Sequence, residues 1–369
     1  MSKWFAIRCD ANAQIGLGHF MRCFALAEHM HQKGYQAFFF MLNPHEFCIN
    51  KVLEIDAEIL ALDEKHLTFN SGTYQHSGWL PHSEVSDANQ CLFQMELLAT
   101  DIGSKPEFIV VDHYAIGAPW ERMLSTAARI IAFDDLNDRK HECHILVDQT
   151  YGKSSESYSG LIGKEANLLV GLQFAILRKE FVRERRSLIR KFNGIKTILI
   201  TLGGVDKRNY TAVIIDCVLN YQAKVLAEFN IVVVVSSLNP NIQMLKEYQV
   251  TYENIEVLVN PQDIAQLMTS SDFCFGAVGS TTWERFALSL PSALCVMAEN
   301  QVLASKILEK ESLVKLINIV DGHIFKEVSD SLDFFRVREN YDENKKRISE
   351  LVDCLGLERI VDLALDKKL

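Results

Sequence analysis

The stretch WFAIRCDANAQIGLGHFMRC, residues 4–23, joins an apolar run to a glycine turn and then to the start of a helical pattern. The apolar run, 4–9, predicts a β-strand. Apolar side chains then recur at helical spacing, at Phe20, Phe24, Ala27 and Met30. This spacing predicts a helix from about His19 to Lys33 with one buried face, and Gly34 is a typical helix end. A strand that leads through a turn into a helix is the repeating unit of α/β proteins.

The same unit recurs along the chain. Further apolar runs that predict strands lie at 37–42, 108–112, 129–135 and 144–148. After a charged stretch, 178–194, they resume at 196–204, 229–235, 255–259, 272–277 and 292–297. Because these runs are continuous rather than alternating, we expect parallel strands that are buried on both faces.

We therefore predict an α/β protein with two doubly wound, Rossmann-like domains that face each other across a cleft. A chain of 369 residues is long enough for two hydrophobic cores. We expect an N-terminal domain over 1–175, a linker over 176–194, a C-terminal domain over 195–330 and terminal helices over 331–369. Ligands of such sheets bind at the carboxyl ends of the strands, so the functional residues should lie there.

Composition and charge exclude several classes of protein. Hydrophobic residues make up 48% of the chain and charged residues 23%, as in globular proteins, and the net charge of −10 argues against a nucleic-acid partner. The apolar runs are too short to span a bilayer and no secretory signal is visible, so we expect a cytoplasmic protein without membrane insertion. Nine cysteines without a CxxC pair argue against disulfides and structural zinc, and the cluster HECH, 141–144, matches no common ligand spacing. We expect neither a metal nor a cofactor.

The first glycine turn does not match a dinucleotide fingerprint. Gly16 and Gly18 allow close approach of the backbone to a ligand, but Met21 stands where a third glycine is needed, and Asn43 stands where an acid should close the second strand. His19 follows Gly18 at the expected helix start, where the helix dipole disfavours an imidazolium and keeps a neutral ring ready to accept a proton. A general base at His19 is therefore one interpretation of this turn. The alternative is a histidine that only caps or packs the helix.

A second turn, GAVGSTTWER at 276–285, has the composition of an anion site. Glycines and hydroxyls from Gly279 to Thr282, including Ser280 and Thr281, stand at an expected helix start, where free N–H groups bind phosphates. Glu284 lies one turn further and is suited to the hydroxyls of a ribose. The alternative is an ordinary helix cap with a surface glutamate.

Other polar residues follow predicted strands. The pair Gly203 and Gly204 ends one strand, the motif VVDHY places Asp112, His113 and Tyr114 at the end of another, and MAENQ does the same for Glu299, Asn300 and Gln301. Polar residues and glycines are common in loops, so one such motif alone is weak evidence. All of these motifs, however, are expected at the carboxyl edge of a sheet.

Taken in order, these motifs resemble a known family. The set RCDANAQIGLGHFMRC, VVDHYAIGAPWE, AFDDLNDRKHECHILVDQ, LRKEF, ITLGGVD and GSTTWER is similar to the UDP-2,4-diacetamido-2,4,6-trideoxy-β-L-altropyranose hydrolases of bacterial pseudaminic acid biosynthesis. These enzymes are relatives of the MurG-type glycosyltransferases, so the resemblance implies the GT-B fold. It runs from about residue 4 to about residue 310, and Val278 stands where the family more often has a smaller residue.

The resemblance implies a UDP-sugar substrate and a reaction. Water attacks the anomeric carbon, UDP leaves, and the free sugar is released with inversion. His19 matches the base that activates the water, and Tyr114 and Asn300 match positions that contact sugar or water. Gly279 to Thr282 would hold the diphosphate and Glu284 the ribose. A glycosyltransferase of the same fold and a non-catalytic nucleotide-sugar binding protein are the alternatives, and the sequence leaves the sugar stereochemistry and the oligomeric state open.

Overall fold

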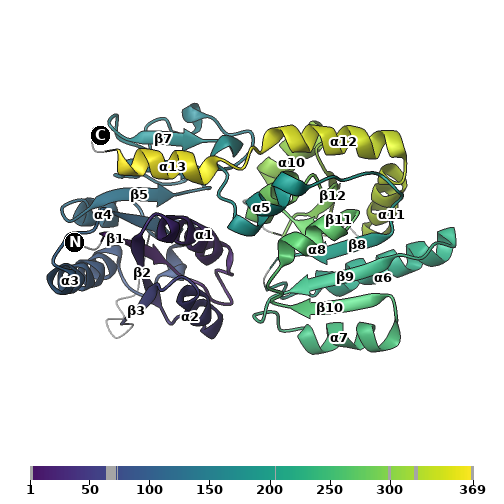
Figure 1. The fold of residues 1–369 in the computed structure, drawn as a ribbon, viewed down its shortest axis with the longest axis horizontal. Helices are drawn as coiled ribbons and strands as arrows, with labels where there is room; N and C mark the ends of the chain where they lie inside the picture. Colours follow the sequence, from purple (N-terminus) through teal and green to yellow (C-terminus); the bar gives the residue numbers. More distant parts are fainter. Residues whose placement is uncertain are drawn as a thin grey trace. The chain divides into compact units, whose positions relative to one another are not determined.

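A computed structural model describes residues 3–63, 72, 74–203, 205–297, 301–319 and 323–366. The chain divides into two compact units. Unit 1 contains residues 1–176 and 355–369, and unit 2 contains residues 177–354. Each unit is an α/β domain with its own parallel sheet (Figure 1). The predicted α/β class with two doubly wound, Rossmann-like domains is therefore confirmed.

The sheet of unit 1 has seven strands in the order β3-β2-β1-β4-β5-β6-β7. The strands are β1 (Lys3–Cys9), β2 (Tyr35–Leu42), β3 (Glu58–Leu62), β4 (Phe108–Asp112), β5 (Arg129–Phe133), β6 (Ile145–Asp148) and β7 (Asn167–Val170). Strands β1 and β4 are central neighbours, and their register pairs Cys9 with Asp112. The polar residues after both strands therefore meet at one edge of the sheet.

Two hydrophobic clusters cover the two faces of this sheet, because successive side chains of a strand point to opposite sides. On β1, Phe5 and Ile7 belong to one cluster, while Trp4 and Ala6 belong to the other. Helix α1 (Gly18–Gln32), α2 (Glu46–Leu53) and α13 (Gly356–Leu365) pack on the first face. Helix α3 (Glu84–Ile102) and α4 (Ala118–Leu124) pack on the second. Short 3₁₀ turns complete the unit: η1 (Ser77–Trp79), η2 (Ser155–Tyr158) and η3 (Leu172–Phe174).

The sheet of unit 2 has six strands in the order β10-β9-β8-β11-β12-β13. They are β8 (Thr197–Thr201), β9 (Asn230–Val235), β10 (Ile255–Val259), β11 (Phe273–Ala277), β12 (Ser292–Cys295) and β13 (Lys315–Ile317). The helices are α5 (Lys179–Ser187), α6 (Tyr210–Val225), α7 (Ile242–Thr251), α8 (Ile264–Ser270), α9 (Ser280–Ala287), α10 (Val302–Lys310), α11 (Ile324–Phe335) and α12 (Arg338–Leu351). The apolar runs at 229–235 and 272–277 thus form buried strands of this core.

The C-terminal segment divides between the units. Helices α11 and α12 lie in unit 2, whereas α13, the last yellow helix in Figure 1, belongs to unit 1. There Arg129 donates from Nη1 to the carbonyl of Ala364 at 3.1 Å. The segment expected as a linker, 176–194, contains α5 and lies almost wholly in unit 2. Among the helices of the described residues, none is both long and apolar enough to cross a bilayer.

Candidate active site

His19 is the second residue of α1, and the turn before it is held by its own hydrogen bonds. The Asn12 side chain accepts the backbone N–H groups of Gln14 and Ile15 at 2.8 and 2.9 Å. Gly16 donates its N–H to the Asn12 carbonyl at 2.8 Å and has φ +81°, a conformation that favours glycine. A Cβ at Gly18 would meet nothing within 4 Å. Gly16 therefore shapes the turn, and Gly18 leaves the start of α1 uncovered.

The His19 ring contacts a buried carboxylate. Nδ1 lies 2.5 Å from Oδ1 of Asp112, the last residue of β4, and the His19 side chain is only 9% exposed. An ionised carboxylate can only accept, so the proton of a neutral ring lies on Nδ1. Nε2 has no hydrogen-bond partner among the described residues. The remaining ring nitrogen is thus an available proton acceptor.

Arg22 holds Asp112 ionised. Its Nε donates to Oδ2 of Asp112 at 2.5 Å, its Nη2 donates to Oδ1 at 2.8 Å, and its Nη1 donates to Asp135 at 2.6 Å. Burial alone would raise the pKa of Asp112, but Arg22 and His19 together bring it well below its ordinary value. Arg22 lies three residues after His19, so both project from the same face of α1. The helix thus presents the His19 imidazole and the Arg22 guanidinium to a single carboxylate.

Aromatic rings surround His19. The Tyr114 ring meets it edge-on at 4.5 Å between centroids, and Trp79 meets it edge-on at 5.8 Å. Trp79 also stacks on Tyr114 at 5.3 Å and contacts His76 at 4.6 Å. The Tyr114 hydroxyl donates to Oδ2 of Asp135 at 2.9 Å. These rings fix the imidazole plane and reduce the access of bulk water to it.

A second buried network supports the same sheet edge from β1. Arg8 is fully buried and pairs with Asp87 of α3 at 2.8 Å and with Asp10 at 2.7 Å. Burial would raise the pKa of Asp10, but Arg8 and His113 lower it to about 2. Nε2 of His113 lies 3.2 Å from Asp10, so the residue after Asp112 is anchored to the neighbouring strand. This network stabilises the backbone next to Asp112, the residue that contacts His19.

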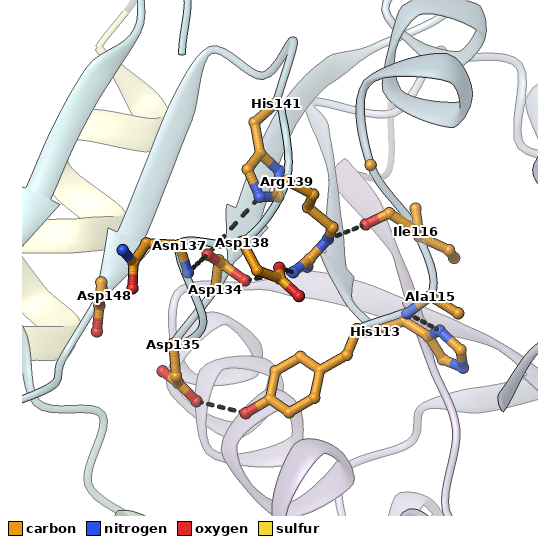
Figure 2. Close-up of polar contacts among 12 residues, drawn as sticks. His113, Ala115, Ile116, Asp134, Asp135, Asn137, Asp138, Arg139, His141 and Asp148 are labelled. Carbon is orange, nitrogen blue, oxygen red and sulfur yellow. Dashed lines mark hydrogen bonds and ion pairs between the residues drawn. The ribbon is translucent and has the colours of Figure 1, made fainter. Parts of the chain in front are cut away.

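The first residue of the cluster HECH, His141, belongs to a buried ion-pair network. His141 Nδ1 lies 2.7 Å from Glu121, and its Nε2 lies 3.7 Å from Asp134. Figure 2 shows Arg139 beside it, where the guanidinium donates to Asp134 at 2.7 Å, to Asp138 at 2.9 Å and to a backbone carbonyl. Among the described residues, no three or more His, Cys, Asp and Glu side chains are grouped as metal ligands. The motif therefore organises the loop that follows β5.

In unit 2, the predicted anion turn is the start of α9. Ser280 is the first helical residue, Gly279 is exposed, and Ser280 and Thr281 are half-buried. Gly279 donates its N–H to the Thr282 hydroxyl at 3.3 Å, which fixes the first turn. Val278, the residue before Gly279, is buried. The geometry presents the N-terminal N–H groups of α9, as an anion site requires.

Glu284 lies one turn further along α9 and is almost fully buried. Its Oε1 accepts from Nε of Arg178 at 2.8 Å. Its Oε2 is buried and has no hydrogen-bond partner among the described residues. A buried carboxylate oxygen without a donor is unfavourable, so this atom is suited to a ligand hydroxyl. The alternative of a surface glutamate at this position is therefore wrong.

The remaining predicted residues divide into two groups. Gly203 follows β8 with φ +92°, and the nearby Asp206 accepts the backbone N–H of Tyr210 and of Thr211 at the start of α6. Gly204 and Asn300 lie outside the described residues. Within unit 1 the fold brings His19 and Tyr114 together, and within unit 2 it brings Gly279–Thr282 and Glu284 together.

The sequence patterns do not single out two residues around His19 and indicate a third only in part. Asp112 is recognised only as one of several strand-end polar residues, while Arg22 and Asp135 are not singled out at all. A signal exists for Arg22, since it lies at helical spacing from His19. Asp135 stands in the FDD motif two residues after β5, but its contact with Arg22 spans 113 residues.

Comparisons with known proteins agree with the ordered motifs. No protein-family profile matches the chain. The UDP-2,4-diacetamido-2,4,6-trideoxy-β-L-altropyranose hydrolase of Campylobacter jejuni is 25% identical over 309 residues, which are 82% of this chain and 95% of that protein. An uncharacterised protein of Methanocaldococcus jannaschii is 23% identical over 80% of this chain, and the match spans 56% of its length.

Solved structures reveal the fold. The crystal structure of MurG from Acinetobacter baumannii superposes with a TM-score of 0.62 at 13% identity, with all of both chains covered. The expected relation to MurG-like proteins is thus confirmed at the level of architecture. The chain has the GT-B fold, and over 82% of its length it resembles the UDP-2,4-diacetamido-2,4,6-trideoxy-β-L-altropyranose hydrolase in sequence.

Proposed function

We propose that this protein hydrolyses a UDP-linked 2,4-diacetamido-2,4,6-trideoxy sugar at the anomeric carbon, as a step of pseudaminic acid biosynthesis. The observation that carries the proposal is the His19–Asp112 pair, whose free Nε2 is suited to activate water. The similarity to the Campylobacter jejuni hydrolase supports the same reaction class. The nine cysteines are all unpaired thiols, which supports a cytoplasmic site of action.

In this reaction Nε2 of His19 accepts a proton from water while the water oxygen bonds to the anomeric carbon. The bond between that carbon and the diphosphate oxygen breaks on the opposite face, so the sugar is released with inversion and UDP departs as an anion. Asp112 stabilises the imidazolium as it forms, since its carboxylate is already ionised. A positioned general base typically accelerates such a step by about 100- to 10,000-fold.

The nucleotide is assigned to unit 2. We propose that the N–H groups and hydroxyls of Gly279–Thr282 bind the diphosphate, and that Oε2 of Glu284 accepts a ribose hydroxyl. Gly203 and Gly204 follow β8 and are proposed to approach the nucleotide through their backbone. Gly16, Gly18, Tyr114 and Asn300 are proposed to contact the sugar or the attacking water. We propose that the reaction proceeds without a metal or a cofactor.

A glycosyltransferase is the nearest alternative, because the same fold passes sugars to acceptors. Purified protein mixed with the UDP-sugar alone separates the two. The hydrolase releases UDP and free sugar in equal amounts, whereas a transferase releases little UDP without its acceptor. A non-catalytic binding protein would bind UDP and turn over nothing.

The deciding experiment follows the anomeric proton by NMR in heavy-oxygen water. We expect the label on the sugar and an inverted anomer as the first product. Label on phosphate would instead place the attack at phosphorus and contradict the proposal. His19→Ala should lose about 100-fold or more of turnover while UDP binding survives, and equal activity in this variant would remove His19 as the base.

A further inference from the structure

Arg285 follows Glu284 on α9 and is fully buried, yet no carboxylate of the described residues pairs with it. The buried arginines of unit 1 differ. Arg8, Arg22 and Arg139 each pair with at least one aspartate within 3 Å. A buried guanidinium without a carboxylate in direct contact is costly, and its presence needs a physical reason.

The Arg285 guanidinium lies directly against the anion turn. Its Nη2 donates to the Ala277 carbonyl at 2.8 Å and to the Thr282 hydroxyl at 3.0 Å, and its Nη1 donates to the Thr281 hydroxyl at 3.3 Å. Its Nε is buried and has no hydrogen-bond partner among the residues that the structure describes. The side chain is therefore held by the residues that form the turn.

Gly276 makes room for this arrangement. A Cβ at position 276 would lie 2.6 Å from Nη1 and 2.7 Å from Cζ of Arg285. Any larger residue would thus displace the guanidinium from beneath the turn. The second glycine of the GAVGSTTWER motif, Gly279, serves the helix start, whereas the first, Gly276, serves the arginine.

The contact with Thr281 has a directional consequence. Because the Thr281 oxygen accepts from Arg285, its own hydroxyl proton remains available to donate. Thr281 is half-buried, so this proton can reach a ligand at the helix start. Burial lowers the pKa of Arg285 by more than the nearby Cys274, Glu284 and Cys295 raise it, and a bound anion would stabilise the charged guanidinium.

We propose that Arg285 is a positioning residue that supplies a buried positive charge to the anion turn and orients the Thr281 hydroxyl toward a diphosphate. The inference rests on the proposed function, because it specifies how that nucleotide site selects a diphosphate. Arg285 acts through Thr281 and through its charge at the start of α9, and it does not contact the ligand itself.

The test is a titration of the full chain by calorimetry with UDP, UMP and uridine. The wild type should bind UDP most tightly. Arg285→Gln should weaken UDP binding by about 10- to 100-fold and leave uridine binding unchanged, and Arg285→Lys should recover part of the loss. The dependence of UDP binding on salt should become weaker in Arg285→Gln, since one positive charge is removed.

Thr281→Val and Thr281→Ser form a matched pair that leaves Arg285 in place. We expect the valine variant to lose UDP affinity by about tenfold and the serine variant to keep it. Gly276→Ala should reduce UDP affinity by displacing the guanidinium. Thermal unfolding of each variant without ligand reports whether it folds. If Arg285→Gln is unfolded, the UDP affinities of Thr281→Val and Thr281→Ser test the proposal instead.

The proposed function and the role of Arg285 would be overturned by different results. A wild type that binds no UDP would overturn the proposed function. A wild type that binds UDP, with folded Arg285→Gln and Thr281→Val variants of equal affinity, would overturn the role of Arg285 alone. A loss that is the same for uridine as for UDP would also overturn it, because a general structural defect does not depend on phosphate.

Discussion

Replacement of Asp112 by asparagine tests how the candidate base is built. Asp112 accepts from His19 at 2.5 Å and from two nitrogens of Arg22 at 2.5 and 2.8 Å. An asparagine has one acceptor and one donor end. One orientation turns the NH₂ group toward Nε of Arg22, and the other turns it toward Nδ1 of His19, which moves the ring proton to Nε2. In both orientations the negative charge that stabilises an imidazolium is lost.

The expected effect on turnover is large. If the pair acts as a general base, kcat should fall by about 1,000-fold, which corresponds to about 4 kcal/mol of activation free energy. Stability should fall as well, since breaking a buried ion pair costs about 3–5 kcal/mol. Arg22 keeps its contact with Asp135 at 2.6 Å, so we expect the lower end of that range.

Asp135→Asn is the matched control. It also removes a carboxylate from Arg22, but it leaves the contact between His19 and Asp112 intact. The assay measures kcat from UDP release below the melting temperature of both variants, together with their thermal unfolding. We expect Asp135→Asn to lose less than about tenfold in kcat. An equal loss of kcat in the two folded variants would refute the reasoning, because the effect would then come from Arg22 and not from the base.

Three further predictions concern binding, pH and packing. Glu284→Ala should weaken UDP binding by about 10- to 100-fold because Oε2 no longer accepts a ribose hydroxyl, and an unchanged dissociation constant in calorimetry would dismiss that contact. Burial would lower the pKa of His141, but Glu121 and Asp134 raise it from 6.5 to about 9. The protonated His141 should therefore contribute about 3 kcal/mol to the free energy of unfolding below about pH 6.5, and this contribution should be lost as the pH rises through 9. His141→Gln should flatten this decline in the melting temperature, and a decline as steep as in the wild type would contradict it. Gly356→Ala should destabilise unit 1 by about 3 kcal/mol, because the added Cβ would lie 2.3 Å from the Ala175 carbonyl oxygen, whereas Gly163→Ala meets nothing within 4 Å and should melt like the wild type.

Strands at the edge of a sheet are harder to predict from apolar runs than central strands. The runs 4–9, 108–112 and 272–277 are predicted because both faces of a central strand are buried, which requires a continuous apolar sequence. Strands β3, β7 and β13 are not predicted, and each lies at an edge of its sheet. Their side chains are largely half-buried or exposed, so their sequences need not be continuously apolar. The assignment of α13 to unit 1 is likewise a matter of packing, against Phe174 and Ala175.

The sequence by itself determined what local chemistry dictates: the buried strands, the glycine turns, and the positions of His19 and Gly279–Thr282 at helix starts. These features follow from backbone periodicity and from the dihedral freedom of glycine, which act over a few residues. Only the tertiary structure decided the electrostatics. The carboxylate that contacts His19 belongs to Asp112, which lies 93 residues further along the chain. The burial of Arg285 depends on Gly276, a strand residue that has no side chain. Pairing of charges depends on which strand ends the fold brings together, and no local pattern encodes that choice.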